Sequence, residues 1–505
     1  MSSTNTPRRA IIVGAGFGGI ALAGLLAKKG VSVDVFETHG SAGGRARVIR
    51  EGGYTFDLGP SWYMMPDVFA EYFTLMGEDI HKHLTLQKLT PSYRVFHGAP
   101  GTHHDFFADR AQNHAIFDAL EPGAGNRLNA YLDESARQYH IAKHEFIYKN
   151  YDSFFDFFNK RVMREGRKLE IWNSMERIIS RTFKHELLRK VMMFQMVLLG
   201  TAPKDAPGMY RLMNHVDFDL GIWYPQGGIG EVPQAMVRIA EKHGARFHYQ
   251  APVSRIITEG GTAVGVVLRD GTEHRADLVV SNADRHHTET ALLAPTEREY
   301  SDRWWQRRTL APSAFILYLG VRKQFPNLVH HNLLFTKDWD RNFREIFNYH
   351  DFPTDPSIYV CAPSKTDSTV APPGCENLFV LVPISAGITD TDAARAAWAD
   401  RTLTILETNM GLTGLREHLQ YQRVYSLREF SADYHSFKGT ALGLAHTLSQ
   451  SALWRPNNVA KKVKNLYYVG SYQNPGIGMP ICIVSAQLAY KRIMGIADPH
   501  PLIEL

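Results

Sequence analysis

A glycine-rich turn between a short apolar segment and a helical one constrains the fold of this chain more than any other feature. Residues 10–13 predict a buried strand, residues 20–29 predict a helix, and residues 31–37 predict a second strand that ends on Glu37. The turn carries three glycines in the spacing G-x-G-x-x-G, and these are Gly14, Gly16 and Gly19. A strand–turn–helix–strand unit of this kind builds parallel sheets, so the sequence predicts an α/β fold.

Each of these positions has a physical reason for its residue type. Gly14 allows the tight turn, Gly16 lets the backbone approach a pyrophosphate, and Gly19 lets the helix pack closely on the strand. The phosphates would lie at the positive end of the helix, and Glu37 would accept hydrogen bonds from the ribose hydroxyls of an adenosine. The unit therefore predicts a Rossmann-like dinucleotide site, a pattern that FAD and NAD share.

A second element favours FAD. Gly43-Gly44-Arg45-Ala46 follows soon after the second strand, and Asp57-Leu58-Gly59-Pro60 comes next. The first of these resembles the G-G-R element with which the flavin amine oxidase and carotenoid desaturase superfamily continues its FAD site. The resemblance implies FAD as the cofactor and places Gly44 and Arg45 in its site.

Motifs along nearly the whole chain resemble those of bacterial and fungal phytoene desaturases, in combination and in order. They occupy residues 57–62, 223–228, 281–284, 434–456 and 474–480. The last of them resembles the second flavin motif of that family.

The residues of this C-terminal motif also favour a close approach of the backbone to a ligand. Gly470 ends a predicted strand, and Pro480 stands where a helix over 479–494 would begin, a favourable position for proline. Many other flavoproteins have Asp after the first glycine, whereas this chain has Ser471, which fits the desaturases. The predicted flavin contacts here are Gly470, Gly476, Gly478 and Met479.

The resemblance implies an FAD-dependent desaturase that introduces conjugated double bonds into phytoene or a related carotenoid precursor. The flavin would accept a hydride, a base or water would remove the proton from the adjacent carbon, and oxygen, a quinone or another acceptor would reoxidise the flavin. Related flavoproteins stay open as alternatives, namely a carotenoid isomerase, a ketolase or an aldehyde-forming oxidase. So does a non-catalytic prenyl-lipid-binding protein of the same fold, although the complete glycine set with Glu37 argues against it.

The 505 residues are too many for one hydrophobic core, so several units are expected. We predict an FAD-binding domain assembled from separated segments, with a helical unit and a strand-rich substrate domain inserted. The segments of the FAD-binding domain are 1–75, 222–300 and 440–505. The helical unit, which would face substrate and membrane, is 76–221, and the substrate domain is 301–439.

Asp156 is the predicted acid–base residue. It lies in the run Phe154-Phe155-Asp156-Phe157-Phe158, where burial would raise the pKa of a carboxyl group and favour proton exchange near neutral pH. Lys160 and Arg161 offer the alternative that Asp156 forms a salt bridge on a helix surface. The apolar segments 154–158 and 191–199 could form the wall of a substrate tunnel or plain core helices.

The remaining features concern partners and location. A net charge of +5, with no dense Lys/Arg tract, argues against nucleic acid. The three cysteines form no disulfide framework, which favours a reducing cytoplasm. The histidine pairs are adjacent rather than at helical spacing, so no metal is predicted. No spanning helix is expected, and a water-insoluble polyene substrate implies peripheral association with a membrane surface.

Overall fold

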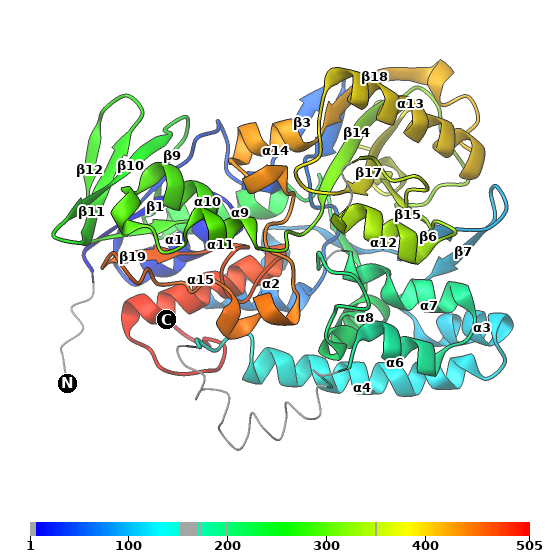
Figure 1. Cartoon of the computed structure of the whole chain (residues 1–505), viewed down its shortest axis with the longest axis horizontal. Helices are drawn as coiled ribbons and strands as arrows, with labels where there is room; N and C mark the ends of the chain where they lie inside the picture. Colours follow the sequence, from blue (N-terminus) through cyan, green and yellow to red (C-terminus); the bar gives the residue numbers. More distant parts are fainter. Residues whose placement is uncertain (1–6, 152–169, 171–172, 198, 349–350) are drawn as a thin grey trace.

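The computed structural model describes residues 7–151, 170, 173–197, 199–348 and 351–505. Its strands fall mainly into two large sheets in separate halves of the molecule (Figure 1). The predicted Asp156 and the segment 154–158 lie outside the described residues.

The first large sheet is parallel and has the strand order β19-β13-β1-β2-β9. Its strands are β1 (Arg9–Val13), β2 (Ser32–Phe36), β9 (Arg246–His248), β13 (Leu278–Ser281) and β19 (Leu466–Tyr468). They come from three stretches of the chain that are far apart in sequence. The prediction of a Rossmann-like domain built from separated segments is therefore confirmed.

Both faces of this sheet are covered, which explains why its strands are almost wholly apolar. Ala10 and Ile12 of β1 pack in one core with three helices, whereas Ile11 and Val13 pack in another with an antiparallel sheet of β10–β12. The helices are α1 (Phe17–Lys28), α9 (Glu231–Lys242) and α15 (Met479–Met494). The antiparallel strands are β10 (Val253–Glu259), β11 (Thr262–Leu268) and β12 (Glu273–Arg275).

The second large sheet has seven strands in the order β18-β14-β17-β16-β15-β6-β7. They are β6 (Tyr93–Phe96), β7 (His103–Phe106), β14 (Ser313–Val321), β15 (His331–Leu334), β16 (Ile358–Cys361), β17 (Glu376–Ile384) and β18 (Leu419–Tyr425). Every residue of β14 is buried, because this strand lies inside the sheet between β17 and β18. Helices α12 (Trp339–Asn348), α13 (Asp392–Asn409) and α14 (Leu427–Tyr434) belong to this half or adjoin it.

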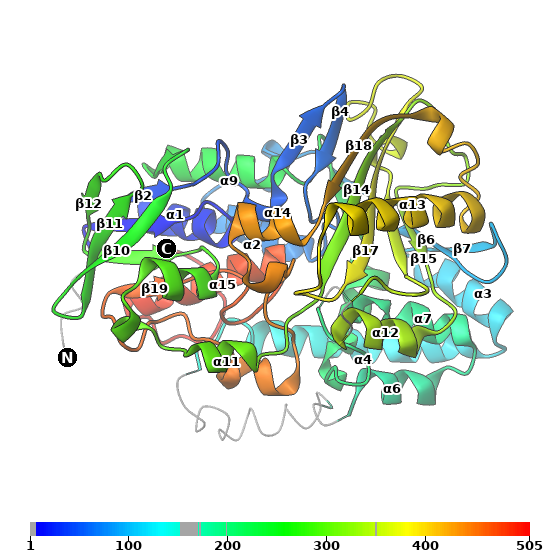
Figure 2. The ribbon, with the colours of Figure 1, turned by 45° about the horizontal axis from the view of Figure 1, so that its top comes forward.

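A helical layer lies below the second sheet in Figure 1. It contains α3 (Arg110–Leu120), α4 (Ala124–Glu145), α6 (Met175–Thr182), α7 (Glu186–Met193) and α8 (Leu212–His215). Shorter elements are α2 (Pro66–Leu75), α10 (Arg285–His287), α11 (Asp302–Gln306), β3 (Val48–Glu51), β4 (Tyr54–Asp57), β5 (Leu86–Lys88) and β8 (Trp223–Pro225). Figure 2 shows β3 and β4 rising between the two halves.

Several predicted bounds agree closely with the observed ones. The last helix begins and ends as expected, and the turn over 269–272 joins β11 to β12. The first helix begins at Phe17, three residues earlier than predicted. The segment predicted to be mainly helical also supplies β6 and β7, because β6 finds its parallel partner β15 more than two hundred residues later in the chain. The predicted domain limits themselves stay predictions.

Candidate functional site

The glycine turn after β1 has the geometry that its sequence requires. Gly14 has a φ of +95°, which favours glycine, and its N–H donates to the Phe36 carbonyl at 2.8 Å. A Cβ added to Gly19 would lie 2.3 Å from the Gly14 carbonyl oxygen, so any side chain there would push α1 away from the turn. Gly16 precedes the first residue of α1, where no side chain caps the helix. The free N–H groups of the first turn are therefore available to an anion.

Glu37 lies beside this turn and is 6% exposed. One carboxylate oxygen accepts the N–H of Ala15 at 2.7 Å, and the other accepts the N–H of His39 at 2.9 Å. These two bonds fix the carboxylate at the edge of a large cavity. Because a carboxylate has about four acceptor positions, capacity remains for the hydroxyl groups of a ribose.

Asn282 lies in the motif at 281–284 but was not predicted from the sequence as a site residue. It follows β13, its Nδ2 donates to the Gly14 carbonyl at 3.1 Å, and a Cβ added to Gly16 would lie 2.9 Å from the same nitrogen. The signal that could have found it is its place at the carboxyl end of a buried parallel strand, where ligands bind in such sheets.

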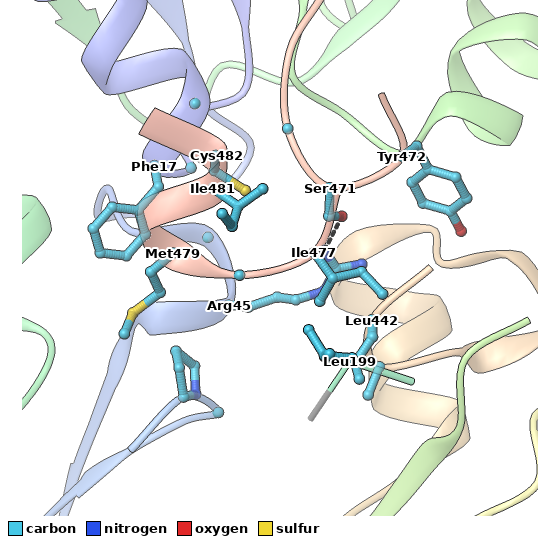
Figure 3. A pocket seen from close by; sticks show the side chains of 18 of the residues that line it. Phe17, Arg45, Leu199, Leu442, Ser471, Tyr472, Ile477, Met479, Ile481 and Cys482 are labelled. Atoms are coloured by element: carbon cyan, nitrogen blue, oxygen red, sulfur yellow. Dashed lines mark hydrogen bonds between the residues drawn. The ribbon is translucent and has the colours of Figure 1, made fainter. Parts of the chain in front are cut away.

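Arg45 reaches across the cavity from the short 3-10 helix Gly44–Ala46 towards the C-terminal segment (Figure 3). Its Nη1 lies 3.5 Å from the Ser471 hydroxyl, its Nη2 donates to the Ser436 hydroxyl at 3.2 Å, and its Cζ lies 5.6 Å from the centre of the Tyr434 ring. The Nε atom is buried and has no partner among the described residues. A buried donor of this kind calls for an acceptor, and a flavin or its phosphates would supply one.

The C-terminal motif closes the same cavity. Gly470 and Gly478 both have a positive φ and line it, and Met479 begins α15 at its edge. Pro480 lies in the first turn of α15, as predicted. Ser471 and Ile477 lie on the loop between them, where Figure 3 shows them close to Arg45.

Gly476 has a different position from the one predicted, because it does not line the cavity. A Cβ there would lie 1.9 Å from Nε2 of His446, which accepts the N–H of Ile477 at 3.4 Å. The other ring nitrogen of His446 lies 3.0 Å from the Leu199 carbonyl. Burial lowers the pKa of His446 to about 3, so the ring is neutral at neutral pH. Through its contact with the N–H of Ile477 it supports the C-terminal loop. His446 was not predicted from the sequence.

Arg455 holds the loop from a second direction and is only 2% exposed. Its guanidinium donates to the backbone carbonyls of Ser471 at 2.7 Å and Gln473 at 3.2 Å, and also to those of Leu444 and Gln450. Four carbonyl partners on one buried cation fix the path of the backbone that borders the cavity.

The cavity has a volume of about 1170 Å³ and continues far beyond the glycines. Its extension passes between the seven-stranded sheet and the helical layer. The walls there are apolar and include Leu199, Ile316, Phe335, Phe379, Leu442 and Ile477. Of the predicted cofactor residues, eight line the cavity, and Gly19 and Gly476 stand behind it.

Carboxylates are scarce among the described residues that line the cavity. Among the described residues that line the cavity, the carboxylates are Glu37, Asp284 and Asp433. Asp284 accepts the N–H of His287 at 3.1 Å, and burial raises the pKa of its carboxyl group. Asp433 forms an ion pair with Arg47 at 3.2 Å. These contacts hold all three carboxylates at the glycine-rich end, and the role of Asp156 stays a prediction.

The apolar segment 191–199 combines both of the expected roles. Met192 and Met196 are fully buried in the core, whereas Phe194, Val197 and Leu199 line the cavity. None of the helices that the structure describes is long and apolar enough to cross a bilayer.

A glycine-rich dinucleotide site that opens into an apolar cavity is typical of a flavin-dependent oxidoreductase. The model of the family described as flavin containing amine oxidoreductase matches residues 17–494. The chain therefore belongs to that family, and it is an oxidoreductase whose cofactor is FAD.

Individual relatives agree with this assignment. The chain is 39% identical over 477 residues to the carotenoid 3,4-desaturase of Haloarcula japonica, which covers 94% of this chain and 96% of that protein. It is 35% identical over 501 residues to the zeta-carotene-forming phytoene desaturase of Myxococcus xanthus, with 98% and 95% covered. An oxidoreductase structure from Methanosarcina mazei has a TM-score of 0.62 at 18% identity, covering 96% of this chain and all of that one. At that identity the likeness shows the fold.

Proposed function

We propose that the protein is an FAD-dependent desaturase that introduces conjugated double bonds into phytoene or a related carotenoid precursor. The observation that carries this proposal is that the glycine-rich turn after β1 and the long apolar extension line one continuous cavity. A polyene has no polar group to bind, so its recognition depends on apolar walls, which this cavity provides. The two relatives described above carry names that agree with such a substrate.

The proposed cofactor site uses both ends of the chain. The first turn of α1 would bind the pyrophosphate and Glu37 the ribose, while Arg45 would donate from Nε to an acceptor of the flavin. Gly470, Gly478 and Met479 would let the backbone approach the ring. When bound, FAD supplies the two-electron acceptor that amino-acid side chains lack.

The protein's own residues would position the substrate and exclude water. Leu442 and Ile477 lie close to Arg45 in Figure 3, so an apolar chain in the cavity would pass beside the flavin end of the site. Apolar walls that exclude water would protect a carbocation on the substrate from attack by water until a base removes the proton from the adjacent carbon. Asp156 remains the proposed base.

We further propose that substrate enters from a membrane surface beside Trp454. This side chain is 55% exposed and Leu448 is 38% exposed, and both line the cavity. An exposed tryptophan at the mouth of an apolar cavity suits the interfacial region of a bilayer. Peripheral attachment on the cytoplasmic side, with oxygen or a quinone as the final acceptor, completes the proposal.

Product analysis tests the function directly. The purified protein, loaded with FAD and given phytoene in liposomes, should yield products that are lighter by two hydrogens per step. Products of unchanged mass would indicate an isomerase, and products heavier by oxygen would indicate a ketolase or oxidase. Bound flavin without any turnover on carotenoid precursors would contradict the proposal.

A further inference from the structure

Three side chains with metal-binding atoms meet behind the cavity wall. His331 begins β15 and lies opposite Cys361, the last residue of β16, and His330 directly precedes β15. His331 is 0% exposed, Cys361 is 1% exposed and His330 is 4% exposed. One potential ligand atom from each lies within 4.8 Å of those of the other two.

The hydrogen bonds of the two imidazoles are alike and incomplete. Nδ1 of His330 lies 2.8 Å from the Thr366 hydroxyl, and Nδ1 of His331 lies 2.7 Å from the Tyr359 hydroxyl. Nε2 of each ring is buried and has no partner among the described residues. A histidine that binds a metal has this arrangement, with one nitrogen held by an oxygen and the other directed at the ion.

We propose that His330, His331 and Cys361 form a binding site for Zn²⁺. Two imidazole nitrogens and one thiolate suit Zn²⁺ better than Mg²⁺ or Ca²⁺, which prefer oxygen ligands. A water molecule would complete the tetrahedral set of four ligands. The site would satisfy two buried nitrogens that otherwise have no partner, each of which costs free energy. The sequence pattern does not reveal this site, because the two histidines are adjacent rather than at helical spacing and Cys361 lies on another strand.

The site has a structural consequence for the cavity. The Trp62 ring stacks on His331 with centroids 4.4 Å apart, and the Tyr359 hydroxyl also contacts Ser61 at 2.7 Å. Trp62, Tyr359 and Ser61 all line the cavity. Zinc would thus tie β15 to β16 and hold this part of the wall in place, without touching the substrate.

Metal analysis of the flavin-loaded protein tests the proposal. After growth with zinc and dialysis against a weak chelator, elemental analysis should find about one zinc per chain. Protein from which zinc has been removed should bind Co²⁺ with a thiolate-to-cobalt charge-transfer absorption. Cys361→Ser and His330→Gln should each lose the zinc, and Cys361→Ser should also lose the charge-transfer band.

Cys375→Ser is the matched control, because Cys375 is also a free, buried cysteine but lies outside the cluster. It should keep both the zinc and the cobalt band. Flavin content and circular dichroism establish that each variant is folded. A wild-type protein that binds neither zinc nor cobalt would overturn the proposal, as would a folded Cys361→Ser protein with full zinc. Copper(I) bound by the same residues in place of zinc would refute the choice of metal.

Discussion

Asn282 and Gly14 join two strands of the parallel sheet at the cofactor turn, since the Asn282 amide donates to the Gly14 carbonyl at 3.1 Å. Asn282→Asp keeps the shape but replaces the donor by a carboxylate that would repel both the carbonyl and a pyrophosphate. We expect a loss of about 1–3 kcal/mol in folding stability and a clear drop in bound FAD, measured by absorbance of the purified protein.

The control for this variant is Asn465→Asp. Asn465 also donates to a backbone carbonyl, that of Asp277 at 2.9 Å, but it lies at the other end of the same sheet and away from the cavity. It should keep full flavin content. Equal flavin content in both variants would refute the role of Asn282.

Glu37→Gln should weaken FAD binding, because the charged acceptor beside the turn is lost while the shape is kept. Hydrogen bonds to a charged group contribute about 1.5–3 kcal/mol, so the Kd for FAD should rise roughly tenfold or more, and Glu37→Arg should abolish binding. Titration of the apoprotein with FAD by fluorescence measures both. Glu273→Arg, on the exposed strand β12, should leave the Kd unchanged. Unaltered binding by Glu37→Arg would mean that the ribose lies elsewhere.

Gly476→Ala should destabilise the C-terminal loop, since its Cβ would overlap Nε2 of His446 at 1.9 Å. The φ of +143° adds strain for any other residue. We expect a loss of about 2–4 kcal/mol in chemical denaturation. The double variant with His446→Ala removes the overlap but not the strain, so it should be less destabilised than the two single variants added together. Strict additivity would show that the two residues do not interact.

Trp454→Asp should reduce membrane attachment if Trp454 borders the entrance. Moving a tryptophan out of the interfacial region and replacing it with a charge should lower partitioning onto anionic liposomes roughly tenfold. Ile503→Asp is a strict control, because Ile503 is 89% exposed but does not line the cavity. A flotation assay at low salt compares them, and equal flotation of the two variants and wild type would exclude this entrance.

Asp156→Asn tests the proposed base. The change keeps the side-chain shape and removes the charge, so a protein with full flavin content should lose turnover, by about 10²-fold or more if Asp156 removes the proton. Normal turnover by the flavin-loaded variant would eliminate it and favour the alternative of a salt bridge with Lys160 or Arg161.

Local sequence signals predicted the parts of the molecule that local chemistry determines. The glycine turn, Glu37 and the last helix were found because their residue types follow from backbone geometry at those positions. Asn282, His446 and Arg455 lie within the motifs at 281–284 and 434–456, but none of them was predicted as a site residue, because each acts on a segment far away in the chain. Strands β6 and β7 were not predicted for a related reason, since β6 is stabilised by pairing with β15, which lies far away in the sequence.

The strand order of the parallel sheet has a consequence for how the protein is made. β19 pairs with β13, and α15 packs on α1, although about 450 residues of translation separate the two helices. The ribosome therefore releases the glycine turn long before the strand and helix that complete its pocket exist. Until then, the edge of β13 and the apolar face of α1 have no permanent cover. A nascent chain stalled before Leu466 should accordingly bind chaperones and fail to take up FAD, whereas one that has emerged fully should take it up in a single late step.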